Sequence, residues 1–211
     1  MSLDLWFAFA AASAVLLSIP GPTILLVVSY AVGAGRTTAL WTVAGVFLGD
    51  LVAITLSMLG LGVLLATSAE LFTLLKFVGG VYLLWLGWKL LRAPVGGGDG
   101  TAELEARSAD ASGRAMLRHA FIVTALNPKS NMFFIAFLPQ FLNPAAPAAA
   151  QFALMAATFT GLAAINALIY ALAASSLRQR IRRPSVLRWM NRAGGAALIS
   201  MGALTFFVRR A

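Results

Sequence analysis

The chain has 211 residues, of which 60% are apolar and only 11% are charged. An ordinary soluble domain is roughly 45–50% apolar and about 25% charged, and it needs that charge to cover its surface. The composition therefore excludes an ordinary soluble enzyme, a disordered chain and a coiled coil, and it indicates an integral membrane protein.

The charged and reactive residues narrow the functional classes. There are 16 basic and 7 acidic residues, an excess that cytoplasmic loops of membrane proteins explain without nucleic-acid binding. The chain has no cysteine and one histidine, His119, which excludes disulfides and multi-histidine metal sites. No glycine-rich loop precedes a Lys-Ser or Lys-Thr pair, so no nucleotide-driven pump is encoded. We therefore expect no catalytic residues, no metal and no cofactor.

The first half of the chain holds three apolar stretches. Residues 5–35 carry no charge, and as one straight helix they would be about 46 Å long, against a hydrocarbon core of about 30 Å. Pro20-Gly21-Pro22 predicts a break within this stretch. The second stretch, residues 40–65, contains Asp50, and the third covers residues 71–88.

The second half repeats this order after a hydrophilic linker at residues 93–113. The fourth stretch, residues 120–138, is interrupted by Asn127-Pro128-Lys129. The fifth and sixth cover about 151–175 and 193–208, separated by a basic loop at 178–192. The chain is thus expected to be all-α with six transmembrane helices. Five spans and a re-entrant segment are the alternative.

The basic residues predict the orientation. Lys and Arg gather in the connections after the first, third and fifth spans, and those after the second and fourth have none. The positive-inside rule places these basic connections, including the linker at 93–113, in the cytoplasm. Both termini would then face outward, although Arg209 and Arg210 at the end of the chain disagree mildly.

Matching features in the two halves predict an inverted repeat. Each half opens with a proline-broken span, and Asp50 in the second span corresponds to Asn166 in the fifth. Gly79-Gly80 precedes Gly87 by the same spacing as Gly194-Gly195 precedes Gly202. Because three spans is an odd number, the halves enter the membrane from opposite sides, as in many secondary transporters. The whole chain is thus expected to form one membrane domain, with repeats at 1–92 and 114–211.

The broken spans predict a binding site. Pro20 and Pro22 lack amide donors, and neighbouring carbonyls lose their helical partners, which must be replaced by protein, water or ligand. Amides at the start of a half-helix can bind a carboxylate, and freed carbonyls can bind an ammonium. An amino acid carries both groups. The alternative is a kink that only aids packing.

Asp50 is the only carboxylate deep in an apolar stretch, and Lys129 directly follows the break in the fourth stretch. A buried carboxylate is costly unless it is paired or protonated, so Asp50 could face water, Lys129 or a substrate ammonium, and could carry a coupling proton. Lys129 could attract a substrate carboxylate or neutralise Asp50. The structural alternatives are a hydrogen bond from Asp50 to a broken helix and a lysine that reaches the interface.

Together these motifs resemble one family. Pro20-Gly21-Pro22, Gly45-x-x-x-Gly49-Asp50, Asn127-Pro128-Lys129 and Phe137-Leu138-Pro139-Gln140-Phe141 are similar to motifs of the LysE/RhtB-type amino-acid exporters. The chain length and the position of the hydrophilic linker are also similar. The resemblance covers essentially the whole chain.

The resemblance implies a secondary active transporter that exports amino acids across the bacterial inner membrane, by proton antiport. The single intramembrane carboxylate favours a neutral substrate such as threonine, homoserine or leucine. The expected partners are the amino acid, protons and the lipid bilayer, without nucleic acid, and a homodimer is compatible with six spans. The residues expected at the substrate site are Pro20, Gly21, Pro22, Gly49, Asp50, Asn127, Pro128 and Lys129, with Asn166 added by the repeat and Asp50 as the ion-coupling group.

The sequence also allows two other kinds of function. One alternative is an exporter of another small solute or cation. The lack of cysteine and the single histidine argue against soft metal ions, and a lone carboxylate argues against hard ones. A second alternative is a membrane scaffold or channel that does not work as a carrier.

Overall fold

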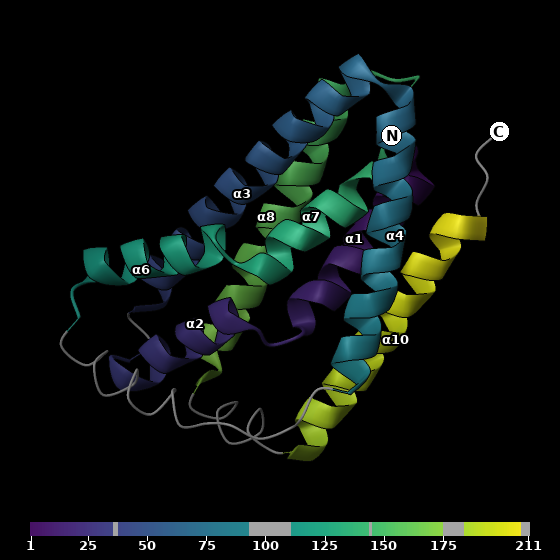
Figure 1. Ribbon diagram of the computed structural model, residues 1–211. Helices are drawn as coiled ribbons and strands as arrows, with labels where there is room; N and C mark the ends of the chain where they lie inside the picture. Colours follow the sequence, from purple (N-terminus) through teal and green to yellow (C-terminus); the bar gives the residue numbers. More distant parts are fainter. Residues whose placement is uncertain (36–37, 93–110, 144, 175–183, 208–211) are drawn as a thin grey trace.

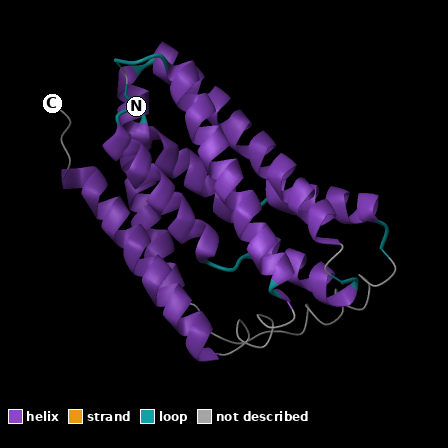
Figure 2. Ribbon diagram, turned by 180° about the vertical axis from the view of Figure 1, so that it is seen from behind, coloured by secondary structure: helices purple, strands orange, loops and turns teal. Residues whose placement is uncertain are grey.

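The computed structural model describes residues 1–35, 38–92, 111–143, 145–174 and 184–207, and Figures 1 and 2 show them as a bundle of helices. No strand occurs in these residues. The predicted linker at 93–113 lies outside the described residues except for its last three. The helices are α1 (Leu3–Ser18), α2 (Pro22–Gly33), α3 (Ala39–Thr67), α4 (Ala69–Leu91), α6 (Gly113–Ala125), α7 (Pro128–Phe141), α8 (Ala148–Leu172) and α10 (Pro184–Phe207).

Both predicted helix breaks are present. The axes of α1 and α2 differ by 56°, and those of α6 and α7 differ by 45°. Pro22 begins α2 and Pro128 begins α7, where the missing amide costs nothing because a first-turn amide has no partner within the helix. Each broken segment therefore consists of two short helices that meet inside the bundle.

The described residues contain two to four candidate membrane spans. Ala39–Val63 of α3 and Ala148–Leu172 of α8 are long and apolar enough to cross a membrane alone, and each bent pair can add one more. The membrane-protein class is thus supported, whereas the six-span count is not confirmed. Helices α4 and α10 have 23 and 24 residues, a sufficient length, but both carry charges along the helix.

Two boundaries differ from those expected. Residues 184–192 were expected in a basic loop but form the first turns of α10, because Pro184 is well suited to a first helical turn. The exposed side chains of Arg188 and Arg192 can leave the apolar region without ending the helix. The fourth apolar stretch was expected to end at residue 138, but α7 continues through Pro139 to Phe141.

Glycines set the closest helix contacts. Helix α3 packs on α6, and α4 packs on α10. A Cβ atom added to Gly49 would lie 2.8 Å from the carbonyl oxygen of Phe121 in α6. A Cβ atom on Gly87 would lie 2.6 Å from the Gly195 carbonyl oxygen, and one on Gly202 would lie 2.8 Å from that of Gly80. These pairs of helices approach so closely because the side chains are absent.

An aromatic cluster fills the centre of the bundle. Phe133 and Phe137 of α7 stack with ring centroids 4.3 Å apart, and Phe134 contacts Phe159 of α8 at 4.7 Å. Phe9 of α1 is fully buried in the same cluster. This packing joins the first half of the chain to the second and fixes the position of α7, which begins at the second break.

Candidate functional site

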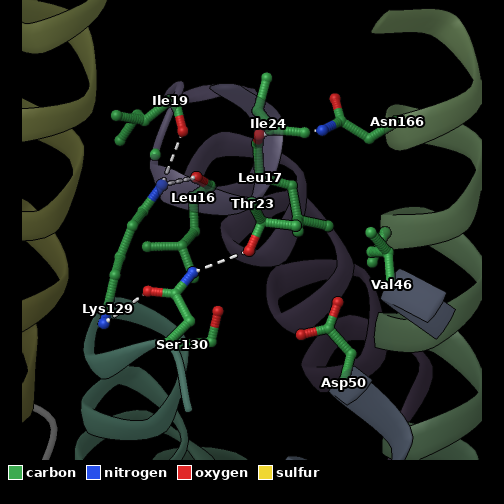
Figure 3. Close-up of a pocket in the computed structure, with 13 residues that line it drawn as sticks. Leu16, Leu17, Ile19, Thr23, Ile24, Val46, Asp50, Lys129, Ser130 and Asn166 are labelled. Atoms are coloured by element: carbon green, nitrogen blue, oxygen red, sulfur yellow. Dashed lines mark hydrogen bonds between the residues drawn. The ribbon is translucent and has the colours of Figure 1, made fainter. Parts of the chain in front are cut away.

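A small cavity lies where the two helix breaks meet (Figure 3). Its volume is about 30 Å³, room for about two water molecules. Both halves of the chain contribute to its wall. The lining residues are Leu16, Leu17, Ile19, Gly21, Thr23, Ile24, Val46, Asp50, Asn127, Lys129, Ser130, Ala163 and Asn166.

The end of α1 is held by Lys129. Its Nζ atom donates to the carbonyl oxygens of Leu16 at 2.8 Å and Ile19 at 2.7 Å (Figure 3). The last carbonyls of a helix have no partner within it, and they form the negative end of the helix dipole, which favours a cation. Lys129 therefore supplies both hydrogen bonds and positive charge at the end of α1. We call the carbonyl groups of Leu16 and Ile19 the carbonyl pair.

The two carbonyls between them also have partners from the second half. Asn166 Nδ2 donates to the Leu17 oxygen at 3.0 Å, and the Tyr170 hydroxyl donates to the Ser18 oxygen at 3.1 Å. Carbonyls freed by the break were expected to be open to a ligand. Instead, side chains of α7 and α8 bond four consecutive carbonyls, the last three of α1 and that of the residue after it.

The start of α2 is different. Gly21 precedes the helix and no side chain caps its first amides. Gly21, Thr23 and Ile24 line the cavity, so the positive end of the helix dipole lies at its wall. Uncapped amides at a helix N-terminus bind carboxylates and other anions.

The second break supplies its own cap. Asn127 Oδ1 accepts a hydrogen bond from the Lys129 amide at 3.1 Å, which caps α7. Its Nδ2 atom donates to the Thr23 hydroxyl at 3.1 Å, and the Thr124 hydroxyl lies 3.4 Å from the same oxygen. Because all three side chains are buried, this cluster joins the two breaks directly.

Asp50 faces the cavity without a partner. It lies on α3 and is only 3% exposed. Among the residues that the structure describes, none forms a hydrogen bond or an ion pair with its carboxylate. Figure 3 shows the lysine ammonium turned toward α1. The direct Asp50–Lys129 pair that the sequence suggested is not formed.

The structure brings together part of the predicted set of site residues. Gly21, Asp50, Asn127, Lys129 and Asn166 line the cavity. The remaining four are not in its wall: Pro20, Pro22 and Pro128 shape the breaks, and Gly49 packs on α6.

Sequence reasoning missed Thr23, which lines the cavity, and Tyr170, which lies outside the cavity and bonds the end of α1. Thr23 directly follows the Pro-Gly-Pro motif, and this position next to a predicted break was the available signal. Tyr170 lies one helical turn beyond Asn166, so the face of α8 that carries Asn166 pointed to it.

The comparisons with known proteins agree with one another. The LysE type translocator family model matches residues 13–208. A Vibrio cholerae protein named as an uncharacterized membrane protein is 32% identical over 97% of both chains. The homoserine/homoserine lactone efflux protein of Salmonella typhimurium is 30% identical over the full length of both.

A shorter match is to the leucine efflux protein of Klebsiella pneumoniae, which is 33% identical over 59% of this chain and 57% of that protein. No solved structure matches the chain. The family is one of translocators and not of enzymes. With its apolar helices and its full-length relatives, the chain belongs to the LysE type translocator family and is a multi-pass protein of the bacterial inner membrane.

Proposed function

We propose that this protein is a secondary active exporter that moves neutral amino acids out of the cytoplasm in exchange for protons. One observation supports this most: uncapped amides of α2 and the unpartnered carboxylate of Asp50 line the same cavity between two broken helices. Broken helices that meet at a cavity are typical of substrate sites in secondary transporters.

The polar groups of the cavity match an amino-acid zwitterion. The substrate carboxylate would bind the amides at the start of α2, and its ammonium would face Asp50. A cationic side chain would need a second carboxylate, and among the described residues Asp50 is the only acidic one that lines the cavity. The names of the relatives, which refer to homoserine and leucine efflux, also support a neutral amino acid.

Asp50 can couple export to protons. An unpartnered carboxylate inside a membrane is strongly disfavoured, so the empty carrier would hold Asp50 protonated. A substrate ammonium would stabilise the ionised form and release the proton. Proton and substrate would thus occupy Asp50 in turn, which is the requirement for antiport.

Transport requires a change of shape. An amino acid is several times larger than a water molecule, and the cavity of about 30 Å³ is too small for it. The backbone leaves the helical path at residues 19–21 and 126–127. The first of these bends is the natural hinge, because its hydrogen bonds come from the other half of the chain. Movement at this bend would enlarge the cavity and open it to one side of the membrane.

We also propose six spans arranged as two inverted repeats, 1–92 and 114–211, joined by a cytoplasmic linker at 93–113. Gly87 contacts Gly195, and Gly80 contacts Gly202. A two-fold axis that relates the two repeats would place Gly80 on Gly195 and Gly87 on Gly202. It would therefore convert each of these contacts into the other. The start of α1 and the end of α10 lie toward the same end of the bundle in Figure 1, as an even number of spans requires. A homodimer stays a prediction.

Efflux from cells preloaded with labelled amino acids tests the function. The comparison includes wild type, Asp50→Asn, empty vector and the exposed Asp4→Asn as a matched control, at equal membrane levels. Wild type and Asp4→Asn should lose one or a few neutral amino acids faster than the vector. Asp50→Asn should export about tenfold more slowly or worse, equivalent to about 1.4 kcal/mol in the barrier.

The alternatives give different results. Wild-type efflux equal to that of the vector for every amino acid would contradict amino-acid export and favour another solute or a scaffold. Full activity of Asp50→Asn would contradict proton coupling through Asp50 while leaving the carrier function intact.

A further inference from the structure

The ammonium group of Lys129 already occupies a binding site for an ammonium. It hydrogen-bonds both members of the carbonyl pair, at 2.8 and 2.7 Å, and the residues that carry these carbonyls line the central cavity. Lys129 belongs to α7 in the second half of the chain, whereas the carbonyl pair ends α1 in the first. This contact therefore joins the two parts that must move relative to each other.

A substrate ammonium has the same chemistry as the lysine ammonium. Both are positively charged groups with three N–H donors, and both are attracted by the negative end of a helix dipole. The side chain of Lys129 reaches across the wall of the cavity to make this contact (Figure 3). Either ammonium can thus satisfy the carbonyl pair, and only one of them can do so at a time.

We propose, resting on the function above, that Lys129 is a tethered substitute for the substrate ammonium. In the empty carrier, its ammonium fills the carbonyl pair. In the loaded carrier, the substrate ammonium takes that place between the carbonyl pair and Asp50, the substrate carboxylate binds the amides at the start of α2, and Lys129 is displaced. The charges balance, because the substrate brings one negative group for the displaced lysine and one positive group for Asp50.

The consequence concerns the return of the empty carrier. A carbonyl without a partner inside a membrane is strongly disfavoured. Without the lysine, the empty carrier would have to change shape with no donor from the described residues at the Ile19 carbonyl, and with only the Ile19 amide, at 3.2 Å, at the Leu16 carbonyl. The loaded carrier would not, because the substrate supplies the ammonium. Net export includes the return of the empty carrier, whereas exchange of one substrate molecule for another does not. Loss of Lys129 should therefore slow net export much more than exchange.

Purified protein in liposomes loaded with labelled L-homoserine, or L-leucine as a second probe, separates these two modes. Dilution into buffer without amino acid measures net efflux, and dilution into the same unlabelled amino acid measures exchange. Lys129→Met removes the charge and donors but keeps the length of the side chain. Its net efflux should fall about tenfold or more, and its exchange should stay within about threefold of wild type, where tenfold is about 1.4 kcal/mol.

Tyr170→Phe is the matched control. It removes one hydrogen bond to the Ser18 carbonyl in the same turn of α1, but no charge, and Tyr170 does not line the cavity. Both modes should remain close to wild type. A control that also loses net efflux alone would show that any weakened cap of α1 has this effect, and it would overturn the specific role of the lysine.

Chemical rescue tests the charge directly, because the chain contains no natural cysteine. In Lys129→Cys, an aminoethyl thiosulfonate reagent rebuilds a lysine-like ammonium, whereas a methyl thiosulfonate reagent adds no charge. Only the aminoethyl product should regain net efflux. Recovery with both reagents would contradict the proposal.

Other outcomes also overturn the proposal. Equal loss of both modes in Lys129→Met would make Lys129 an essential substrate ligand, and loss of neither would remove its role. If Lys129→Met, Lys129→Arg and Lys129→Cys all disappear from the membrane while Tyr170→Phe accumulates, Lys129 is a structural cap. Failure of the proposed function is distinct, because folded wild-type protein would then transport no amino acid in either mode.

Discussion

The two helix breaks have the same cause, but the backbone groups that they free have different hydrogen-bond partners. In both, a proline starts the second helix. At the second break, Asn127 caps the amide of Lys129, and Asn131 Nδ2 donates to the Ala125 carbonyl at 3.0 Å, so nearby residues of the same chain segment satisfy the freed groups. At the first break, α1 ends on hydrogen bonds from α7 and α8, and no side chain caps α2.

This difference assigns different mechanical roles to the two breaks. Where residues of the same segment bond the freed backbone groups, these hydrogen bonds are kept when neighbouring helices move. Where residues of the other half bond them, the hydrogen bonds are lost or exchanged when the halves separate. We therefore expect the second break to act as a fixed frame and the first break as the part that changes partners during transport.

The largest expected effect is a loss of stability at the packing of α3 on α6, which holds the second break. Gly49→Ala would place a Cβ atom 2.8 Å from both the Phe121 carbonyl oxygen and the Thr124 Cβ atom, so α3 and α6 must separate. Such overpacking costs about 1–3 kcal/mol. The apparent melting temperature of the purified protein in detergent should fall clearly.

Gly60→Ala on the same helix is the control for that change. Apart from the adjacent backbone of its own helix, no atom of the described residues lies within 4 Å of its added Cβ atom, and alanine favours a helix over glycine by up to about 1 kcal/mol. Its melting temperature should stay the same or rise. If both variants melt alike, α6 is not held in place by α3, and the second break is not a fixed frame.

The next effect concerns the cap of the second break. Asn127→Ala removes the side-chain acceptor of α7 as well as the donor to Thr23, whereas Asn127→Ser keeps an oxygen that can cap. Loss of an N-cap typically costs about 1 kcal/mol, so the alanine variant should unfold at lower denaturant concentration than the serine variant. Equal stability would mean that Asn127 serves the contact with Thr23 and not the cap.

The positions of the two breaks could be predicted from the sequence because their causes are local. Proline lacks an amide donor wherever it occurs, so Pro22 and Pro128 indicate where a helix must begin again. Asp50 was also recognisable, because a lone carboxylate in an apolar stretch has a cost that depends on few details. Its place in the cavity wall agrees with that interpretation.

The partners at the breaks could not be predicted, because they depend on contacts between distant segments. Nothing near Lys129 shows that its ammonium reaches residues 16 and 19, more than a hundred positions earlier. The number of spans could not be predicted for a related reason. Whether α4 and α10 cross the bilayer depends on where their charged residues lie relative to the membrane surface, and spacing alone does not fix that.

The smallest expected effect tests whether the first break truly depends on the second half. Tyr170→Phe removes the hydrogen bond of 3.1 Å to the Ser18 carbonyl, and a single such bond contributes about 1 kcal/mol. Tyr82→Phe is a matched control, because the structure gives Tyr82 a ring contact with Trp85 and no hydrogen bond to another described residue. Tyr170→Phe should lower the melting temperature slightly more than Tyr82→Phe does. Equal melting temperatures would mean that the Ser18 carbonyl finds another donor, and the end of α1 would then depend on the second half only through Lys129 and Asn166.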